Sequence, residues 1–230
     1  MRLAATLASL SLVLACGGDD AITPPPIDAA APPAWQPGLP AALTMGARRG
    51  LTPVRGIIHL HSPYSHDACD GNPRPGPGGE IDEGCLAHLR AALCTLRIGY
   101  AALSDHDASM ADEDFATLFS VRGSDALVMG PSGPIASRLT CADGHTVLVT
   151  VGSENPLMPI MLDRHVPGSL AERHALYDAD TPAAVAAFRA AGALVWIPHT
   201  EQRTTPELVA LAPDGIEIYN LHANLDPDIR

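Results

Sequence analysis

The feature that most constrains the fold is a repeated unit, in which a short apolar segment is followed by a polar residue of a type that binds metals. Four such segments are 57–60, 100–104, 146–151 and 194–197, and the polar residues are His61, His106, Glu154 and His199, respectively. Stretches with the apolar spacing of helices lie between them. Apolar strands that alternate with helices predict an α/β fold with a parallel sheet and right-handed crossovers.

The predicted helices have recognisable ends. The first begins near Asp82 and Glu83 and ends at Gly99, and a shorter one is expected over 112–119. Thr181-Pro182 and Thr205-Pro206 each place a threonine cap before a proline at the first helical position, which predicts helices over 183–191 and up to residue 211. A last strand is expected over 215–219, followed by His222.

The segment that contains His59 and His61 indicates a metal site. Ile57, Ile58 and Leu60 are apolar, so this segment is expected to be a buried strand. Residues two apart on a strand point to the same face, and two neutral imidazoles on one face make half of a metal site. An isolated pair of this kind would more often be two solvent-facing histidines. The recurrence of metal-type residues after later strands argues for the metal site instead.

These residues are predicted to meet at one end of the sheet. The strands deliver His59 and His61, His106, Glu154, His199 and, in addition, His222 at their carboxyl ends. In a closed βα barrel that end carries the active site. By contrast, His88 on a helix and His145 in a turn are expected to be surface residues.

The amino-terminal region predicts export. Arg2 precedes an apolar run too short to span a bilayer, and Leu14-Ala15-Cys16 then resembles the end of a bacterial lipoprotein signal, with Cys16 as the lipidated residue. An ordinary secretory signal with an incidental cysteine is the alternative. Residues 17–42 are rich in proline and alanine and are expected to form a tether, so the domain extends over 43–230. We therefore expect a membrane-anchored protein of the cell envelope, on its periplasmic or extracellular face.

Charge and cysteine content narrow the possible partners and the compartment. The net charge of −12 argues against a nucleic-acid partner held through its phosphates. The four cysteines after Cys16 are Cys69, Cys85, Cys94 and Cys141, an even number that predicts disulfides in an exported protein. Of the possible pairings, Cys69 with Cys85 is favoured, because it would close the loop 70–79 beside the His59/His61 turn. A thiolate metal site is disfavoured because the chain has no Cys-x-x-Cys.

From about Arg55 onwards the chain resembles the PHP (polymerase and histidinol phosphatase) family of metal-dependent phosphoesterases, which are relatives of the amidohydrolases. The resemblance lies in four short motifs: His59-Leu60-His61-Ser62, Ser104-Asp105-His106, Gly152-Ser153-Glu154 and Pro198-His199. They are similar to the family's opening His-x-His, its Thr/Ser-Asp-His, its Gly-x-Glu and its later histidine motif. The first two are the more specific.

The resemblance implies a distorted seven-stranded TIM-like (β/α)7 barrel with two or three zinc, manganese or iron ions. Carried over, His59 and His61 bind one ion, Glu154 bridges, His199 serves another, and His106 is a further ligand. Asp105, Glu154 and His199 are then the catalytic residues, with Asp105 either ligating or orienting a ligand. After the first loop the ligand is either His66 or Asp67, with Asp67 favoured.

The chain also departs from the family pattern. The late Asp-x-His motif has no counterpart, so we expect a barrel that is incomplete at its carboxyl-terminal end. His165 is the best candidate for a histidine between Glu154 and His199, and Arg164 and Arg203 are candidates to bind a substrate phosphate. The expected function is a metal-dependent phosphoesterase that acts on a small molecule. The alternatives are a hydrolase of other bonds, and a surface lipoprotein that binds metal without catalysis.

Overall fold

The computed structural model describes residues 42–74, 76 and 79–218. The expected signal peptide with Cys16, the tether up to residue 41, and His222 lie outside the described residues. A single-turn 3₁₀ helix, η1 (Ala42–Met45), opens the described part of the chain.

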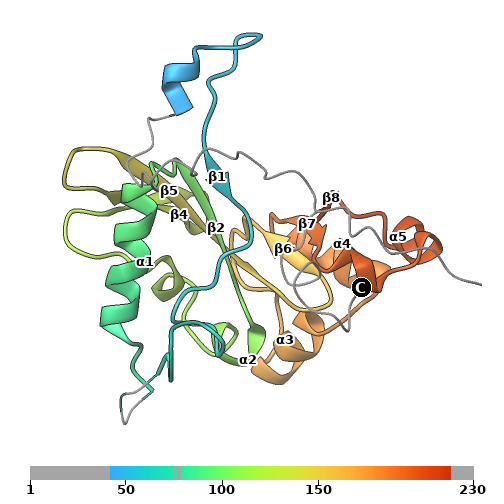
Figure 1. Ribbon diagram of the computed structural model, residues 1–230. Helices are drawn as coiled ribbons and strands as arrows, with labels where there is room; N and C mark the ends of the chain where they lie inside the picture. Colours follow the sequence, from blue (N-terminus) through green and yellow to red (C-terminus); the bar gives the residue numbers. More distant parts are fainter. Residues whose placement is uncertain (1–41, 75, 77–78, 219–230) are drawn as a thin grey trace, which may run out of the picture. The chain divides into compact units, whose positions relative to one another are not determined.

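The larger sheet has five strands in the order β1-β2-β5-β4-β3 (Figure 1). Its parallel half consists of β1 (Gly56–Ile57), β2 (Tyr100–Asp105) and β5 (Thr146–Ser153). Its antiparallel half is a hairpin of β3 (Ala126–Gly130) and β4 (Gly133–Thr140), with β4 paired to β5. The carboxyl ends of the parallel strands therefore lie at one edge of this sheet.

The smaller sheet has three strands in the order β6-β7-β8. β6 (Met158–Ile160) is antiparallel to β7 (Leu194–Ile197), which is parallel to β8 (Gly215–Ile216). A backbone hydrogen bond of 2.8 Å from the amide of Leu162 to the carbonyl of Val151 links the segment after β6 to β5. Over the described residues the fold is mixed α/β, and its strands form two sheets without closing into a barrel.

Side-chain chemistry explains where the helices begin. Asp82 caps α1 (Glu83–Thr95), and Thr181 caps α4 (Pro182–Ala190), each by accepting a hydrogen bond from a backbone amide of the first turn. Reciprocal capping boxes begin α3 (Leu170–Tyr177) and α5 (Thr205–Leu211). The short helical turns are α2 (Asp107–Met110), η2 (Thr117–Phe119) and η3 (Thr200–Gln202).

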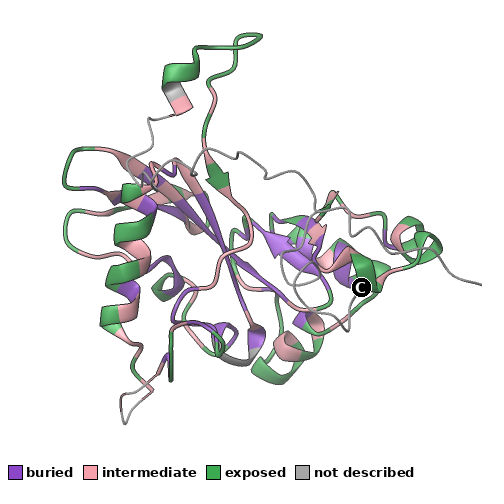
Figure 2. Ribbon diagram, in the orientation of Figure 1, coloured by how far each residue is buried: buried purple, intermediate pink, exposed green. Residues whose placement is uncertain are grey.

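The two faces of β2 pack against different layers. Ala101 and Leu103 belong to the same buried cluster as Leu93 of α1, whereas Ala102 packs with Met158 and Ile160 of β6. This alternation follows from the two-residue period of a strand. Both faces are thus covered, and β2 and β5 are buried along most of their lengths (Figure 2). Both strands accordingly carry apolar residues on both faces.

Close packing at Gly152 brings the smaller sheet against β5. A Cβ atom at this position would lie 2.4 Å from the carbonyl oxygen of Pro159 in β6 and 2.9 Å from that of Leu103 in β2. Only glycine allows the three backbones to approach in this way. Gly152 therefore lets β6 lie directly beside the strand end from which Glu154 emerges.

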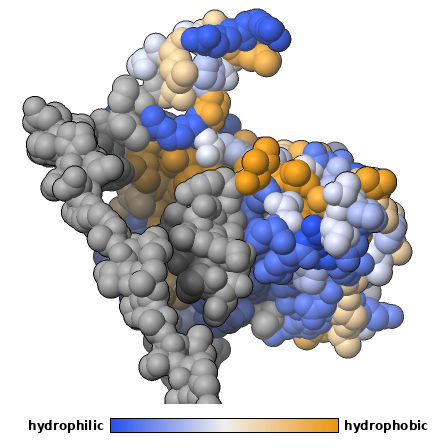
Figure 3. Space-filling model, turned by 45° about the vertical axis from the view of Figure 1, so that its right-hand side comes forward, coloured by the Kyte–Doolittle hydropathy of each residue, from blue (hydrophilic) through white to orange (hydrophobic). Residues whose placement is uncertain are grey.

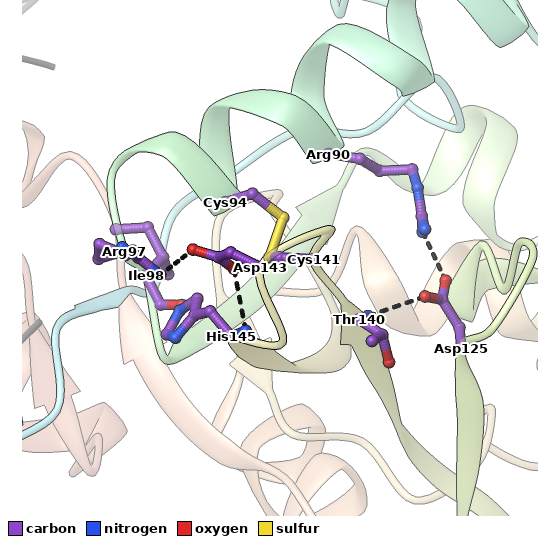
Figure 4. Close-up of a disulfide and its surroundings, with 9 residues drawn as sticks. All are labelled: Arg90, Cys94, Arg97, Ile98, Asp125, Thr140, Cys141, Asp143 and His145. Carbon is purple, nitrogen blue, oxygen red and sulfur yellow. Dashed lines mark hydrogen bonds and ion pairs between the residues drawn. A yellow bond between two sulfur atoms is a disulfide. The ribbon is translucent and has the colours of Figure 1, made fainter. Parts of the chain in front are cut away.

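Two disulfides tie α1 to the rest of the domain. Cys69 is bonded to Cys85, which is the pairing favoured from the sequence, and Cys94 is bonded to Cys141. Figure 4 shows the second disulfide beside two ion pairs, one between Arg97 and Asp143 and one between Arg90 and Asp125. The first disulfide lies in the region of the predicted site, whereas the second fastens the other end of α1 to the turn after β4.

Several sequence expectations about the fold are wrong. The larger sheet is not entirely parallel, because the hairpin β3–β4 is antiparallel, and in the smaller sheet β6 is antiparallel to β7. The helix expected over 112–119 is a loop that ends in the turn η2, and α3 was not expected. The first strand stops at Ile57, although Leu60 still contacts β2: its carbonyl accepts from the Ser104 amide at 2.8 Å, and its amide donates to the Ser104 hydroxyl at 3.1 Å.

The surface of the described part combines polar areas with apolar patches, as Figure 3 shows for one face. Large exposed apolar side chains include Met45, Leu51, Met129, Val209 and Ile218. Among the described helices, none combines the length and the apolar character needed to cross a membrane.

Candidate metal centre

Strand ends from both sheets bring a cluster of histidines and carboxylates together. His59 and His61 follow β1, His106 follows β2, Glu154 follows β5, and His199 follows β7. The parallel strands of each sheet end on the same side, so these residues converge although they are far apart in sequence. Five of the residues predicted as ligands thus lie in one place.

Glu154 is the centre of this cluster. Its Oε2 atom lies 2.8 Å from Nε2 of His59 and 2.7 Å from Nε2 of His61, and its Oε1 atom lies 2.8 Å from Nε2 of His199. The Glu154 side chain is only 5% exposed. A buried carboxylate that faces three imidazoles is the arrangement expected of a residue that binds metal together with those imidazoles.

A second group of ligand atoms adjoins the first. Asp67 places Oδ1 2.8 Å from Nδ1 of His61 and Oδ2 3.3 Å from Nε2 of His106. The ligand atoms of His59, His61 and Glu154 lie within 4.8 Å of one another, and so do those of His61, Asp67 and His106. His61 belongs to both groups. Each group could therefore hold a metal ion with nitrogen and oxygen ligands.

Further residues hold the rings in place. Glu217 accepts a hydrogen bond of 2.6 Å from Nδ1 of His59, and the backbone carbonyl of Glu154 accepts one of 2.6 Å from Nδ1 of His106. Fixing the outer nitrogen of a histidine determines its tautomer and leaves the inner nitrogen for a metal. Ser65, which is fully buried, donates from its hydroxyl to Asp67 at 2.5 Å.

His199 reaches the cluster through an unusual backbone conformation. Its φ angle is 50°, in the left-handed region, which costs a residue with a Cβ atom about 1 kcal/mol. The backbone amide of His199 donates to Oε2 of Glu217 at 3.2 Å, so the same carboxylate supports both His59 and His199. Non-glycine residues in this region gather at functional sites, where the surrounding structure enforces them.

Asp105 lies beneath the cluster. Its carboxylate is fully buried and accepts two hydrogen bonds from Ser62, one from the backbone amide at 2.5 Å and one from the hydroxyl at 2.7 Å. Burial raises the pKa of Asp105 to about 6, although both hydrogen bonds from Ser62 act against this rise. The sequence suggested that Asp105 either ligates or orients a ligand. Its contacts support the orienting role, because it holds the residue next to His61.

The cluster favours positive charge at its centre. Burial would lower the pKa of His59, but the hydrogen bonds to Glu154 and Glu217 outweigh it and raise this pKa to about 9. Burial also opposes the ionised form of Glu154, yet the hydrogen bonds from His199, His59 and His61 hold its pKa well below the usual range. Both shifts have the same cause, because the Glu154 carboxylate and the imidazoles stabilise opposite charges on each other.

Not every residue predicted for the site belongs to it. His66 is exposed, with its ring centroid 4.8 Å from that of His106, and Asp67 rather than His66 joins the described ligand groups. His165 is used elsewhere: Nε2 donates to the carbonyl of Glu113 at 2.8 Å, and Nδ1 lies 3.2 Å from the hydroxyl of Tyr177. His165, a candidate from the sequence, therefore lies apart from the described ligand groups.

The two arginines proposed to bind phosphate also have structural partners. Arg164 donates to the carbonyl of Ala190 at 2.5 Å. Arg203 forms an ion pair with Asp180 and donates to the carbonyl of Pro156 at 2.9 Å. Both guanidinium groups are thus engaged in fastening one segment to another.

Sequence reasoning missed Glu217 and the serines 62 and 65. Glu217 directly follows β8 and thus repeats the pattern of a polar residue after an apolar strand. The sequence predicts a strand over 215–219, which places Glu217 inside the strand. In the structure the strand ends at Ile216. Only a sequence prediction that ended the strand there would have marked Glu217 as a site residue.

Comparison of the chain with family models, with curated proteins and with solved structures gave no match.

Proposed function

We propose that the protein is a metal-dependent hydrolase, most consistent with a phosphoesterase of the PHP type. The observation that carries the proposal is the position of Glu154, whose carboxylate faces three histidines from three strand ends beside a second group with Asp67. Neutral imidazole and carboxylate suit zinc, manganese and iron. His59, His61, Glu154 and His199 would hold one ion, and Asp67 and His106 would complete the site of a neighbouring one.

Divalent ions held in this way lower the pKa of water and stabilise negative charge that develops on a substrate oxygen. The residues of the chain itself supply the geometry. Asp105 fixes Ser62 and thereby the turn that carries His61, while Glu217 fixes His59 and the backbone of His199. Such outer contacts are needed to keep ligands in productive positions.

The described sheets are compatible with parts of a PHP-type barrel. In that proposal, the parallel strands β1, β2 and β5 and the parallel pair β7 and β8 are parts of the barrel wall, with the ligands at their carboxyl ends. The antiparallel strand β6 departs from a regular βα barrel. The resemblance in four motifs supports the assignment.

The setting of the proposed enzyme is the cell envelope. Disulfides persist in oxidising compartments, and two of them fit the export predicted from the segment that ends at Cys16. The substrate would then be a small extracytoplasmic molecule, and the net charge of −12 disfavours nucleic acid. Lipidation of Cys16 would anchor the protein to the membrane surface.

A second candidate function is the hydrolysis of bonds other than phosphate esters. It is favoured because the two candidate phosphate-binding arginines already have partners within the chain. Phosphate recognition commonly uses arginine forks, yet Arg164 and Arg203 are bound to carbonyls and to Asp180. The metal ligands alone do not select phosphorus over carbon as the centre attacked. Carboxylic esters and amides therefore belong in the same assay.

The test compares His61→Asn with His145→Asn in the full-length chain. His61 belongs to both ligand groups, whereas His145 lies in the turn before β5 and is 2.6 Å from the carbonyl of Ile98. Wild type and His145→Asn should bind divalent zinc or manganese and hydrolyse nitrophenyl phosphate. His61→Asn should lose most of the bound metal and about a hundredfold or more in rate. Less than about one ion per wild-type chain after addition of either metal would contradict the proposal.

A further inference from the structure

The segment that leads into β1, residues 42–55, differs from the rest of the chain in charge. It contains three arginines, Arg48, Arg49 and Arg55, and neither aspartate nor glutamate. The whole chain, by contrast, has 14 basic and 26 acidic residues and a net charge of −12. Positive charge gathered in one segment of an acidic protein suits an anionic partner that the rest of the surface would repel.

Two of these arginines lie at the tip of a short hairpin. The Arg48 amide donates to the Leu51 carbonyl and the Leu51 amide to the Arg48 carbonyl, both at 2.9 Å. The φ angles of the two central residues are positive, 52° at Arg49 and 76° at Gly50, which is typical of a type I′ turn. Arg48 and Arg49 are exposed, and among the residues that the structure describes neither guanidinium group has an ion-pair partner. Both are thus available to an anion outside the chain.

Large apolar side chains lie in the same segment. Met45 is 63% exposed, Leu51 73% and Val54 58%. A Cβ atom added at Gly46 or Gly50 would have no other atom within 4 Å, so the hairpin stands clear of its surroundings. Figure 1 shows the segment in light blue beyond the start of β1, and Figure 3 shows both hydrophilic and hydrophobic residues on it. Exposed apolar side chains beside cations suit the interfacial region of an anionic lipid bilayer.

The segment lies at the end of the larger sheet opposite the metal cluster. The carbonyl of Arg55 accepts hydrogen bonds from the amides of Gly99, at 2.8 Å, and Tyr100, at 3.2 Å, where β2 begins. The candidate ligands instead follow the carboxyl ends of the parallel strands. A carboxylate in the turn before β5, Asp143, is paired with Arg97. A surface that bound this segment would therefore leave the metal cluster open to solvent.

We propose that the segment 42–55 is a second membrane contact, which binds a bilayer of anionic phospholipid. The two hairpin arginines bind headgroup oxygens, and the three exposed apolar side chains enter the interfacial region. The contact goes beyond the proposed hydrolase and does not depend on it. The predicted lipidation site, Cys16, precedes this segment in the chain, so the anchor would keep the segment close to lipid and make even a weak contact effective.

Flotation of the full-length Cys16→Ser chain with vesicles tests the contact apart from the acyl chains. One set of vesicles is phosphatidylcholine, and the other is an equal mixture of phosphatidylcholine and phosphatidylglycerol. The chain should bind the mixed vesicles about tenfold more tightly at low salt, and high salt should reduce this preference by screening the headgroups. Any binding by the apolar amino-terminal run is common to all variants, so the ratio of the two affinities is compared.

A matched pair of double variants in this chain isolates the two arginines. Arg48→Gln/Arg49→Gln should bring the two affinities to within about twofold of each other, because both headgroup contacts are lost. Ala171→Glu/Ala175→Glu makes the same change in net charge at exposed positions of α3, which is fastened to α2 by the ion pair of His174 with Asp107. Because α2 follows the carboxyl end of β2, this control should retain the tenfold preference.

A third variant tests the apolar part of the contact. Leu51→Ser should weaken binding to the mixed vesicles about fivefold or more, and this loss should persist in high salt, because burial of apolar surface is not screened. Thermal melting of each variant checks that it is folded.

Three results would overturn the membrane contact. They are equal affinity of the Cys16→Ser chain for the two kinds of vesicle, an equal loss of preference in the two double variants, and unchanged binding by Leu51→Ser. The last would favour a polar anionic partner, such as an acidic protein, over a bilayer. None of them bears on the hydrolase, which is judged by metal binding and by turnover.

Discussion

Replacing both cysteines of the Cys69–Cys85 disulfide with serine tests how far the metal site depends on the loop that carries Asp67. Cys69 lies two residues after Asp67 and has a left-handed φ of 70°, while Cys85 belongs to the first turn of α1. The disulfide therefore holds the end of this loop against a helix. Its loss should allow the Asp67 carboxylate to move away from His61 and His106.

The second disulfide, between Cys94 and Cys141, is the matched control. The two disulfides span 16 and 47 residues. The entropy of the closed loop predicts losses of about 3 kcal/mol and about 4 kcal/mol in the free energy of unfolding, respectively. Opening Cys94–Cys141 should therefore destabilise the fold more. Opening Cys69–Cys85 should weaken metal binding more, by about tenfold, which is typical of contacts that orient metal ligands.

Two measurements separate these effects. Urea denaturation in the presence of a strong chelator gives the stability of each double variant without metal. Competition with a chromophoric chelator gives the zinc affinity of the folded chain. If both double variants lose zinc affinity equally, or if Cys69→Ser/Cys85→Ser retains the wild-type affinity, the reasoning about the Asp67 loop is wrong.

Three further predictions concern single residues. Glu217→Ala removes the carboxylate at Nδ1 of His59 and should lower zinc affinity about tenfold in the same competition assay; an unchanged affinity would show that this contact does not orient the ring. Burial lowers the pKa of His165, so the folded protein binds fewer protons there, and the free energy of unfolding should fall as the pH drops below about 6.5. His165→Gln should flatten this dependence in urea melts between about pH 8 and pH 5.5, and an equally steep loss in the variant would count against the assignment. Cys16→Ser should move the protein from the membrane fraction to the soluble one, whereas identical fractionation would refute the lipid anchor.

The ligands that could be predicted from sequence are those at the ends of strands. His61, Glu154 and His199 each follow an apolar segment, and the ends of parallel strands meet regardless of the details of packing. The choice between His66 and Asp67 was harder, because both lie in an irregular loop whose path depends on Ser65 and on the disulfide at Cys69. Local sequence carries little information about such long-range contacts.

The parts of the fold that were missed had weaker local signals. The hairpin β3–β4 turns at Gly130-Pro131-Ser132-Gly133, which is a turn sequence, but the apolar run of β3 is short and partly exposed. Helix α3 begins with a capping box between Ser169 and Glu172, but at eight residues it is too short to show a clear helical period. Both elements are stabilised by their neighbours more than by their own sequence.

The hydrogen bond between His59 and Glu217 joins residues that are 158 positions apart. A contact of such separation costs more loop-closure entropy than a local one. The ligand set is therefore complete only in molecules whose two sheets have both formed. We expect that an ion bound there leaves when the segment of β7 and β8 opens locally, so the residence time of the metal would report the lifetime of the closed carboxyl-terminal region.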